Sequence, residues 1–396
     1  MITRHLEPYL RRDAGYYPVV TLTGPRQSGK TTLTRQVFPG HTYCSLEDLE
    51  NRRFAQDDPR GFLRQYNGPV ILDEVQRCPD LVSYIQTDVD RDATPGRFIL
   101  TGSQNFLLMV RISQSLAGRS AVLHLLPLSR SELEGQSSTV PDTPKKLFQN
   151  SSTRLDCWDI VRTGLYPRIH DRQIPAEIWL PDYIRTYVER DLRSLVNVGD
   201  LETFERFLSL CAGRTGQLLN FSSLASDSGI AVDTARRWIS ILKTSFLVFL
   251  LRPHHRNFNK RIIRSPKLYF HDTGLACQLL GIKTREQLIQ HPLRGALFEN
   301  FVIAETQKNY IHHREEPPLF FWRDQTGHEI DLLIDHAGEL YPCEIKSGAT
   351  VQGSMLDTLR WWNGLTQTPA ESTVLIYGGE QSSERHGIRI RPWFAV

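Results

Sequence analysis

The sequence predicts a multidomain α/β protein whose first domain is built around a parallel sheet. The chain has 396 residues, more than one hydrophobic core normally accommodates. From Val19 to Gly102, short apolar runs alternate with helical segments, a rhythm typical of parallel strands joined by helices. Helical patterns then dominate, and strands return towards the C-terminus. We therefore expect further domains after the first.

The composition argues against a membrane protein, a secreted protein and a protein held together by disulfides. Hydrophobic residues make up 40% of the chain and charged residues 23%, as in ordinary globular proteins. No apolar run approaches the roughly 18 residues of a membrane span, and the N-terminus has no apolar signal segment. The six cysteines form no CxxC pair, so free thiols are expected. These features predict a cytoplasmic protein. A stretch rich in Ser, Pro and charge, residues 126–146, is expected to form an exposed linker.

A phosphate-binding motif follows the first apolar run. Residues 24–31 match GxxxxGK[ST]. In such a loop, glycines let backbone N–H groups turn towards phosphate oxygens, and the next helix presents its positive dipole end. Lys30 should reach the β and γ phosphates of ATP, and the Thr31 hydroxyl should bind Mg²⁺. The predicted nucleotide contacts are Gly24, Pro25, Arg26, Gln27, Ser28, Gly29, Lys30, Thr31 and Thr32.

Polar residues end the next two buried strands. "PVILDE" places Asp73 and Glu74 after an apolar run. Asp73 is expected to hold Mg²⁺ and Glu74 to polarise the attacking water. The run "RFILTGSQ" ends in Thr101 and Ser103, where a polar group would contact the γ-phosphate or the water, or would simply end the strand. The sequence therefore predicts ATP hydrolysis, with Ser103 among the catalytic candidates.

The middle of the chain is basic. From Leu201 to Phe270 there are 11 Lys or Arg against 4 Asp or Glu. Two helical segments with a turn at Ser228–Gly229, followed by a strand–loop–strand pattern, predict a winged helix. A basic block indicates a polyanionic partner, so we expect DNA; the alternative is packing between subunits. The predicted phosphate contacts are Arg236, Arg237, Arg256, Lys260, Arg261 and Arg264.

A second acidic site is predicted in "HEIDLLIDHAGELYPCEIKS". If Ala337 and Gly338 form a two-residue turn, Asp331 lies opposite Glu344. Lys346 shares the face of Glu344. Two carboxylates this close repel each other unless a cation joins them, and Glu299 in an upstream helix pattern could add a third. The predicted metal ligands are Glu299, Asp331 and Glu344, with Lys346 near a metal-bound water. The alternative is a solvated sheet face.

The order of these motifs resembles that of AAA+ ATPases. The stretches "GPRQSGKTTL", "ILDEVQ", "LTGSQ" and "SLAGR" followed by "LPLSRSEL" are similar to a prokaryotic subgroup with a C-terminal domain of unknown function. The resemblance implies a homo-oligomeric ring, often a hexamer, in which a neighbouring subunit supplies an arginine to the γ-phosphate. Arg119 is the candidate, and Arg111 and Arg190 are competitors.

The C-terminal pattern resembles the PD-(D/E)XK nuclease superfamily, with a helix Glu, a strand Asp and (D/E)-x-Lys on the next strand. That resemblance implies Mg²⁺ held by Asp331 and Glu344, and a water positioned by Lys346 for attack on a phosphodiester. Such folds also serve only for binding. The predicted domains are an AAA+ P-loop domain (1–135), a helical lid (150–200), a winged helix (201–270) and a nuclease-like α/β domain (285–396).

Two functions are compatible with these features. One is an ATPase acting on DNA by binding, remodelling or processing branched forms, with a C-terminal domain that cleaves or binds it. The other is a non-nucleolytic ATP-dependent switch or scaffold that binds a protein partner.

Overall fold

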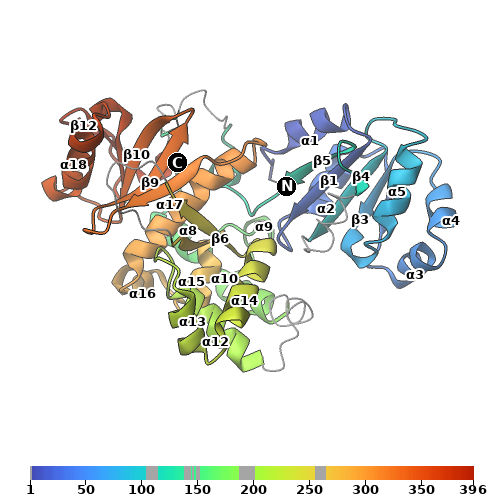
Figure 1. The fold of residues 1–396 in the computed structure, drawn as a ribbon, viewed down its shortest axis with the longest axis horizontal. Coiled ribbons are helices and arrows are strands. Elements are labelled where there is room, and N and C mark those ends of the chain that lie inside the picture. The colour runs from blue at the N-terminus through green and yellow to red at the C-terminus, as the bar shows by residue number, and fades with distance from the viewer. Residues whose placement is uncertain are drawn as a thin grey trace.

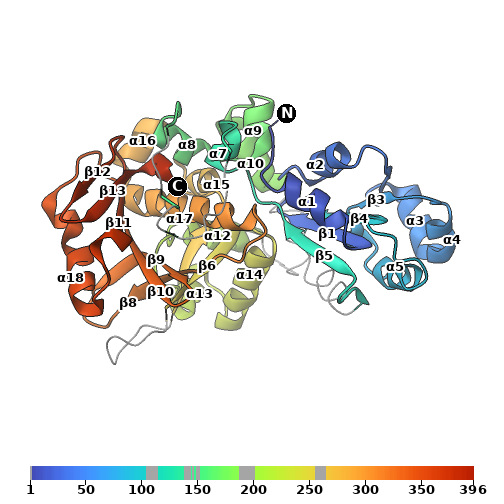
Figure 2. The same ribbon diagram turned by 90° about the horizontal axis from the view of Figure 1, so that it is seen from above.

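The computed structural model describes residues 2–103, 115–137, 144, 147–148, 152–186, 201–254 and 265–396. The N-terminal α/β part lies at one end of the molecule, and helix α18 (Asp357–Thr366) lies at the other (Figures 1 and 2). Within the described ranges, no helix combines the length and the apolar character that crossing a membrane requires.

The N-terminal part contains a five-stranded sheet in the order β2-β3-β4-β1-β5. All neighbouring strands in it run parallel, which confirms the predicted parallel sheet. Its strands are β1 (Val19–Gly24), β2 (Thr42–Ser45), β3 (Val70–Asp73), β4 (Phe98–Ser103) and β5 (Ser120–His124). Its helices are α1 (Glu7–Ala14), α2 (Lys30–Val37), α3 (Leu49–Asp57), α4 (Pro59–Arg64), α5 (Leu81–Val89) and the short η1 (Val75–Arg77).

Both faces of this sheet are covered. Val20 packs into an apolar cluster with α1 and α2, whereas its neighbour Val19 packs into a second cluster with α3, α4 and α5. Every residue of β1 and β3 is buried, because successive side chains of a strand point to opposite faces. This explains the continuous apolar runs in the sequence.

The second part contains an eight-stranded sheet in the order β12-β13-β11-β10-β9-β8-β6-β7. Its strands are β6 (Val248–Pro253), β7 (Lys267–Phe270), β8 (Leu319–Arg323), β9 (Glu329–His336), β10 (Glu339–Lys346), β11 (Val374–Tyr377), β12 (Ser383–Arg385) and β13 (Ile388–Pro392). Residues Leu332 and Ile334 pack with helix α17 (Arg294–Ile311), whereas Leu333 packs with α18. The sheet thus lies between two helical layers.

The remaining helices share one core with this sheet. They are α7 (Arg130–Leu133), α8 (Cys157–Thr163), α9 (Pro167–Asp171), α10 (Ala176–Tyr183), α12 (Leu201–Ala212), α13 (Phe221–Ser228), α14 (Val232–Thr244), α15 (Thr273–Leu279) and α16 (Arg285–Gln290). Their buried apolar side chains form a single cluster that runs from Leu128 to Phe394.

The segments predicted as a lid (150–200), a winged helix (201–270) and a C-terminal domain (285–396) share one hydrophobic core. Helices α12 to α14 and the antiparallel pair β6–β7 follow one another as a winged helix would require. However, β6 also pairs in parallel with β8. A strand added at this edge satisfies backbone groups that β8 would otherwise leave unpaired, and this joins the segments into one sheet.

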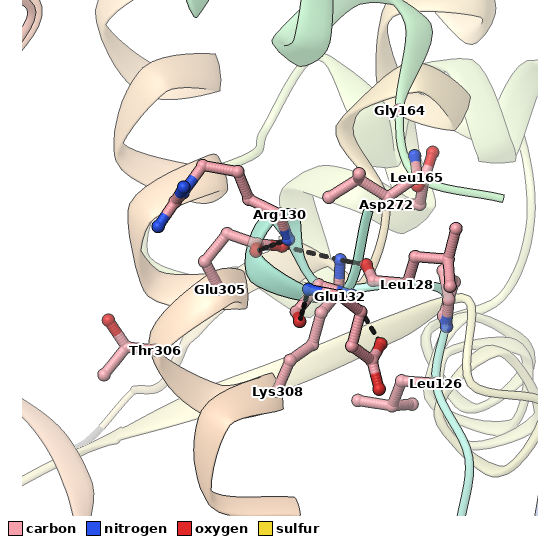
Figure 3. Close-up of polar contacts among 12 residues, drawn as sticks. Leu126, Leu128, Arg130, Glu132, Gly164, Leu165, Asp272, Glu305, Thr306 and Lys308 are labelled. Atoms are coloured by element: carbon pink, nitrogen blue, oxygen red, sulfur yellow. Dashed lines mark hydrogen bonds and ion pairs between the residues drawn. The ribbon is translucent and has the colours of Figure 1, made fainter. Parts of the chain in front are cut away.

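The predicted exposed linker is wrong for its first residues. Leu126, Leu128, Arg130 and Glu132 are all buried, and Ser129 and Glu132 form a capping box at the start of α7. Figure 3 shows the reason. The Arg130 backbone N–H donates to Glu305 Oε2 (2.6 Å), and Lys308 Nζ donates to the Leu128 carbonyl (3.0 Å). Helix α17 thus satisfies backbone groups of this segment. The buried charged side chains have partners of their own, since Arg130 pairs with Glu134 and Glu132 pairs with Arg4.

Candidate functional site

The phosphate-binding loop joins the carboxyl end of β1 to the start of α2. Gly29 is the N-cap residue of α2 and has a φ of 94°, in the left-handed region. A Cβ added at Gly24 would lie 2.1 Å from the Leu125 carbonyl oxygen. Only glycine tolerates both a left-handed backbone and a neighbour that leaves no space for a Cβ. The loop therefore needs its glycines to turn tightly, and it brings the helix N-terminus to the place where phosphates would bind.

Lys30 folds back into this loop. Its Nζ donates to the carbonyl oxygens of Gly24 (3.1 Å) and Pro25 (2.7 Å). Burial lowers the pKa of Lys30 to about 8, against the opposing effect of the Glu74 and Asp73 carboxylates. The buried Ser28 hydroxyl has no hydrogen-bond partner in the described part of the chain. An ammonium group and an unsatisfied hydroxyl inside the loop suit the oxygens of a phosphate chain.

The predicted pair Thr31 and Asp73 is brought together. Thr31 Oγ1 donates to Asp73 Oδ2 (2.9 Å), and Thr101 Oγ1 donates to the other carboxylate oxygen. A hydroxyl and a carboxylate, completed by phosphates and water, are ligands that Mg²⁺ prefers. The residues present therefore fit a nucleotide-bound Mg²⁺, which Thr31 and Asp73 would hold.

Tyr43 was not predicted, yet its hydroxyl donates to Asp73 Oδ2 (2.8 Å). Burial and the hydrogen bond to Asp73 raise the pKa of Tyr43 to about 12. No sequence signal identifies it, because β2 lies beside β3 only in the folded sheet.

Glu74 lies at the turn after β3, in the left-handed region with a φ of 57°. The amide of Gln76 donates both to the Glu74 carboxylate and to Ser103 Oγ (2.8 Å). Burial raises the pKa of Glu74, and the nearby Lys30 ammonium partly opposes this. Since β4 lies between β3 and β1, Ser103 ends its strand beside the loop. Gln76 is a second residue that sequence reasoning missed.

A cavity of about 450 Å³ opens at these residues. From the N-terminal part it is lined by residues 26–33 of the loop and by Asp73 and Glu74. Its other walls include Arg4, Leu128, Pro167 and Arg168 of α9, and Arg172 directly after α9. Arg168 is exposed, and α9 lies outside the predicted P-loop domain. A second segment of the chain therefore completes the pocket, which local sequence patterns did not reveal.

Arg119 lies away from this pocket in its own chain. It directly precedes β5, whose first residue pairs with Val19 at the start of β1. Arg119 therefore lies at the amino end of the strands, whereas the phosphate loop lies at their carboxyl end. Its Nε lies 2.6 Å from Asp90 Oδ1. Arg111 and Arg190 lie outside the described residues.

The predicted C-terminal hairpin is confirmed. Ala337 and Gly338 have φ angles of 54° and 89°, and the strands pair from Glu339↔His336 to Cys343↔Leu332. This register puts Asp331 next to Glu344. Lys346 Nζ lies between them, 3.1 Å from Asp331 Oδ2 and 2.6 Å from Glu344 Oε2. Burial, followed by repulsion from Asp331, raises the pKa of Glu344 to about 8.

Glu299 belongs to a neighbouring group. Its Oε1 accepts hydrogen bonds from Lys267 Nζ (3.1 Å) and the Tyr269 hydroxyl (2.5 Å). In the described part of the chain, no group of three or more His, Cys, Asp or Glu side chains could hold a metal ion. The predicted ligands Glu299, Asp331 and Glu344 lie near one another, but lysine ammonium groups hold them. As arranged, they do not fit a divalent metal.

The predicted nucleic-acid contacts are only partly described. Arg236 and Arg237 are exposed on α14, and the Arg236 guanidinium lies 4.8 Å from the centre of the Phe221 ring. The other four, Arg256, Lys260, Arg261 and Arg264, lie outside the described residues.

Comparison with known proteins assigns families to the segments. A family described as "AAA domain" matches residues 16–134. Domains of unknown function match the rest: DUF8612 covers residues 154–286 and DUF4143 covers residues 294–394. The boundary between the last two falls before α17, although β6 and β8 share one sheet across it.

Two curated relatives match nearly the whole chain. The uncharacterized proteins Rv2008c of Mycobacterium tuberculosis and Mb2031c of Mycobacterium bovis are each 35% identical over 376 residues, which cover 94% of this chain and 79% of theirs. Among solved structures, the Walker-type ATPase PABY2304 of Pyrococcus abyssi aligns with 15% identity and a TM-score of 0.38, over 69% of this chain and 94% of that one. The chain thus belongs to the family of these mycobacterial proteins, and its N-terminal part is a P-loop ATPase domain of the AAA type.

Proposed function

We propose that this protein hydrolyses ATP with Mg²⁺ and uses the energy to act on DNA, as a homo-oligomer that forms a ring. The observation that supports hydrolysis is the convergence of Thr31, Asp73 and Glu74 on one cavity at the phosphate loop. A protein that only binds nucleotide has no need of a carboxylate beside the Mg²⁺ residues.

Each side chain of the pocket has a distinct role in this proposal. The loop backbone and Lys30 bind the phosphates, and Thr31 and Asp73 hold Mg²⁺, which neutralises phosphate charge. Glu74 orients the attacking water and accepts its proton, a role that its raised pKa favours. Gln76 and Ser103 keep the Glu74 carboxylate in place.

The substitution Glu74→Gln tests hydrolysis. We expect turnover to fall by about 10²–10⁴-fold, the usual contribution of a general base, while ATP still binds. Glu47→Gln is the matched control, because Glu47 also lines the cavity but is 62% exposed. Unchanged turnover in Glu74→Gln would refute the assignment.

DNA is proposed as the partner on the strength of the basic block and of the exposed Arg236 and Arg237. ATPase activity should rise with at least one of linear, branched or single-stranded DNA. The stimulation should weaken in Arg236→Ala/Arg237→Ala and persist in Arg360→Ala, which removes an arginine of α18 outside the block. If no form of DNA binds or stimulates turnover, the switch or scaffold that recruits a protein becomes the better proposal.

The C-terminal site is proposed to bind this DNA, with cleavage as the alternative, because Glu299, Asp331, Glu344 and Lys346 follow the nuclease-like pattern while lysine ammonium groups hold the carboxylates. Incubation of the three DNA forms with Mg²⁺ or Mn²⁺ tests cleavage. If the site cleaves, cutting should disappear in Asp331→Ala and in Lys346→Ala. Equal cutting by the variants and the original chain would point to a contaminating nuclease.

A further inference from the structure

Lys267 is the least expected residue of the C-terminal site. It belongs to the basic block by sequence, but it points inward and its side chain is only 3% exposed. It comes from β7, within the segment 154–286 rather than the C-terminal domain. Its Nζ forms ion pairs with Glu299 and with Glu329 at the start of β9. A residue from another family segment therefore completes this site.

Two ammonium groups divide four carboxylates between them. Lys267 holds Glu299 and Glu329, and Lys346 holds Asp331 and Glu344. Two further polar groups face this cluster: Arg323 Nη1 lies 2.8 Å from Glu329 Oε2, and the Tyr269 hydroxyl donates to Glu299.

The two halves also affect each other electrostatically. Burial alone would lower the pKa of Lys267, but the carboxylates of Glu299, Asp331 and Glu329 raise it above its ordinary value. The Lys267 ammonium group therefore acts on Asp331 as well as on the two carboxylates that it contacts. This ammonium group thus serves as a cation for both halves of the cluster.

One buried oxygen in the cluster remains unsatisfied. Glu344 is 2% exposed, and its Oε1 has no hydrogen-bond partner in the described part of the chain. A buried carboxylate oxygen without a partner is costly. The cluster therefore retains the capacity to accept one more cation or donor, although a lysine already contacts one oxygen of each of the four carboxylates.

We propose that Lys267 is the resident cation of this cluster and keeps a divalent metal out of it. The inference rests on the proposed function only in that both concern the same carboxylates of the C-terminal site. In this arrangement the ammonium group keeps Glu299 and Glu329 engaged, so the cluster as it stands does not take up a divalent metal. A residue from a segment outside the C-terminal domain is thus responsible for the exclusion.

Metal binding, measured without DNA, tests the inference. The full chain carries Asp73→Asn to weaken Mg²⁺ binding at the phosphate loop, and bound Mn²⁺ is measured from the loss of the free-ion electron paramagnetic resonance signal. Lys267→Met should bind Mn²⁺ about tenfold more tightly or better, because a unit positive charge beside the ion is removed. Lys267→Arg keeps the charge and should bind as weakly as Lys267 itself.

The gain must also depend on the carboxylates. It should disappear in Lys267→Met/Asp331→Asn. If Lys267→Met does not fold, Lys267→Met/Glu329→Gln removes one charge of each sign and should still bind Mn²⁺ more tightly than Glu329→Gln alone. The inference is overturned if removing the lysine charge leaves Mn²⁺ affinity unchanged or lower, or if the gain survives Asp331→Asn. A failure to bind or cleave DNA would refute the proposed function without altering this Mn²⁺ result.

Discussion

Arg4 connects the phosphate loop to the second part of the molecule, and its removal should weaken both stability and nucleotide binding. Its Nη1 donates to the Ser28 carbonyl in the loop (2.8 Å), and its Nη2 donates to the Leu126 carbonyl (2.7 Å). Its Nε lies 3.1 Å from Glu132 Oε1. Glu132 in turn lies 3.4 Å from His312, directly after α17. Arg4, Glu132 and His312 are all buried.

The structure sets the size of the effect. Arg4→Met leaves Glu132 charged and buried without its cation, and loss of one partner of a buried ion pair costs about 3–5 kcal/mol. Glu132 keeps hydrogen bonds from the backbone N–H groups of His5 (2.8 Å) and Ser129 (2.9 Å), so we expect the lower end, about 3 kcal/mol. Arg4→Met/Glu132→Gln removes both charges. It should cost less than the sum of the two single substitutions, by about 1–3 kcal/mol.

Two measurements check this prediction. Urea unfolding followed by circular dichroism gives the stability of the original chain, both single variants and the double variant. Titration with ATP gives nucleotide affinity, which should fall in Arg4→Met because the Ser28 carbonyl loses its anchor. Additive stability losses, or an Arg4→Met variant as stable as the original chain, would refute the reasoning.

Four further outcomes are expected. ATP affinity should fall as pH rises through about 8, because Lys30 then loses the proton that attracts phosphate; equal affinity at pH 7 and 9.5 would contradict this. Tyr43→Phe should raise the Mg²⁺ concentration for half-maximal ATPase activity by about tenfold, since a hydrogen bond to a charged group is worth about 1.5–3 kcal/mol. If this Mg²⁺ concentration is unchanged, Tyr43 does not position the carboxylate of Asp73. Arg168→Ala should weaken ATP binding, because it removes a cation from the pocket wall, and an unaltered dissociation constant would argue against contact. Despite its burial, Glu132 has a pKa well below its ordinary value because of Arg4 and His312. The stability that its carboxylate contributes is therefore present above about pH 4.3 and is lost as pH falls through the lowered pKa. The loss of urea stability at acidic pH should be smaller in Glu132→Gln, and an equal loss in both proteins would contradict this.

Features that depend on local chemistry could be predicted from the amino-acid sequence alone. The loop from Gly24 to Thr31 needs glycines at particular positions, and the structure places a tight turn there. The apolar runs predicted buried parallel strands, because a strand covered on both faces excludes polar residues. The register that sets Asp331 beside Glu344 followed from a two-residue turn and a side-chain period of two. All three depend on a few consecutive residues.

Which distant groups share a site depends on how the chain folds back on itself, and local patterns do not predict it. Tyr43 reaches Asp73 because β2 and β3 are neighbours in the sheet, and Arg168 reaches the nucleotide pocket because α9 packs beside the loop. Lys267 belongs to the basic block of the sequence, yet carboxylates from α17 and β9 hold it inside. A charged side chain is buried only where partners compensate its lost hydration. Those partners lie far apart in the chain, so the local pattern does not carry the information.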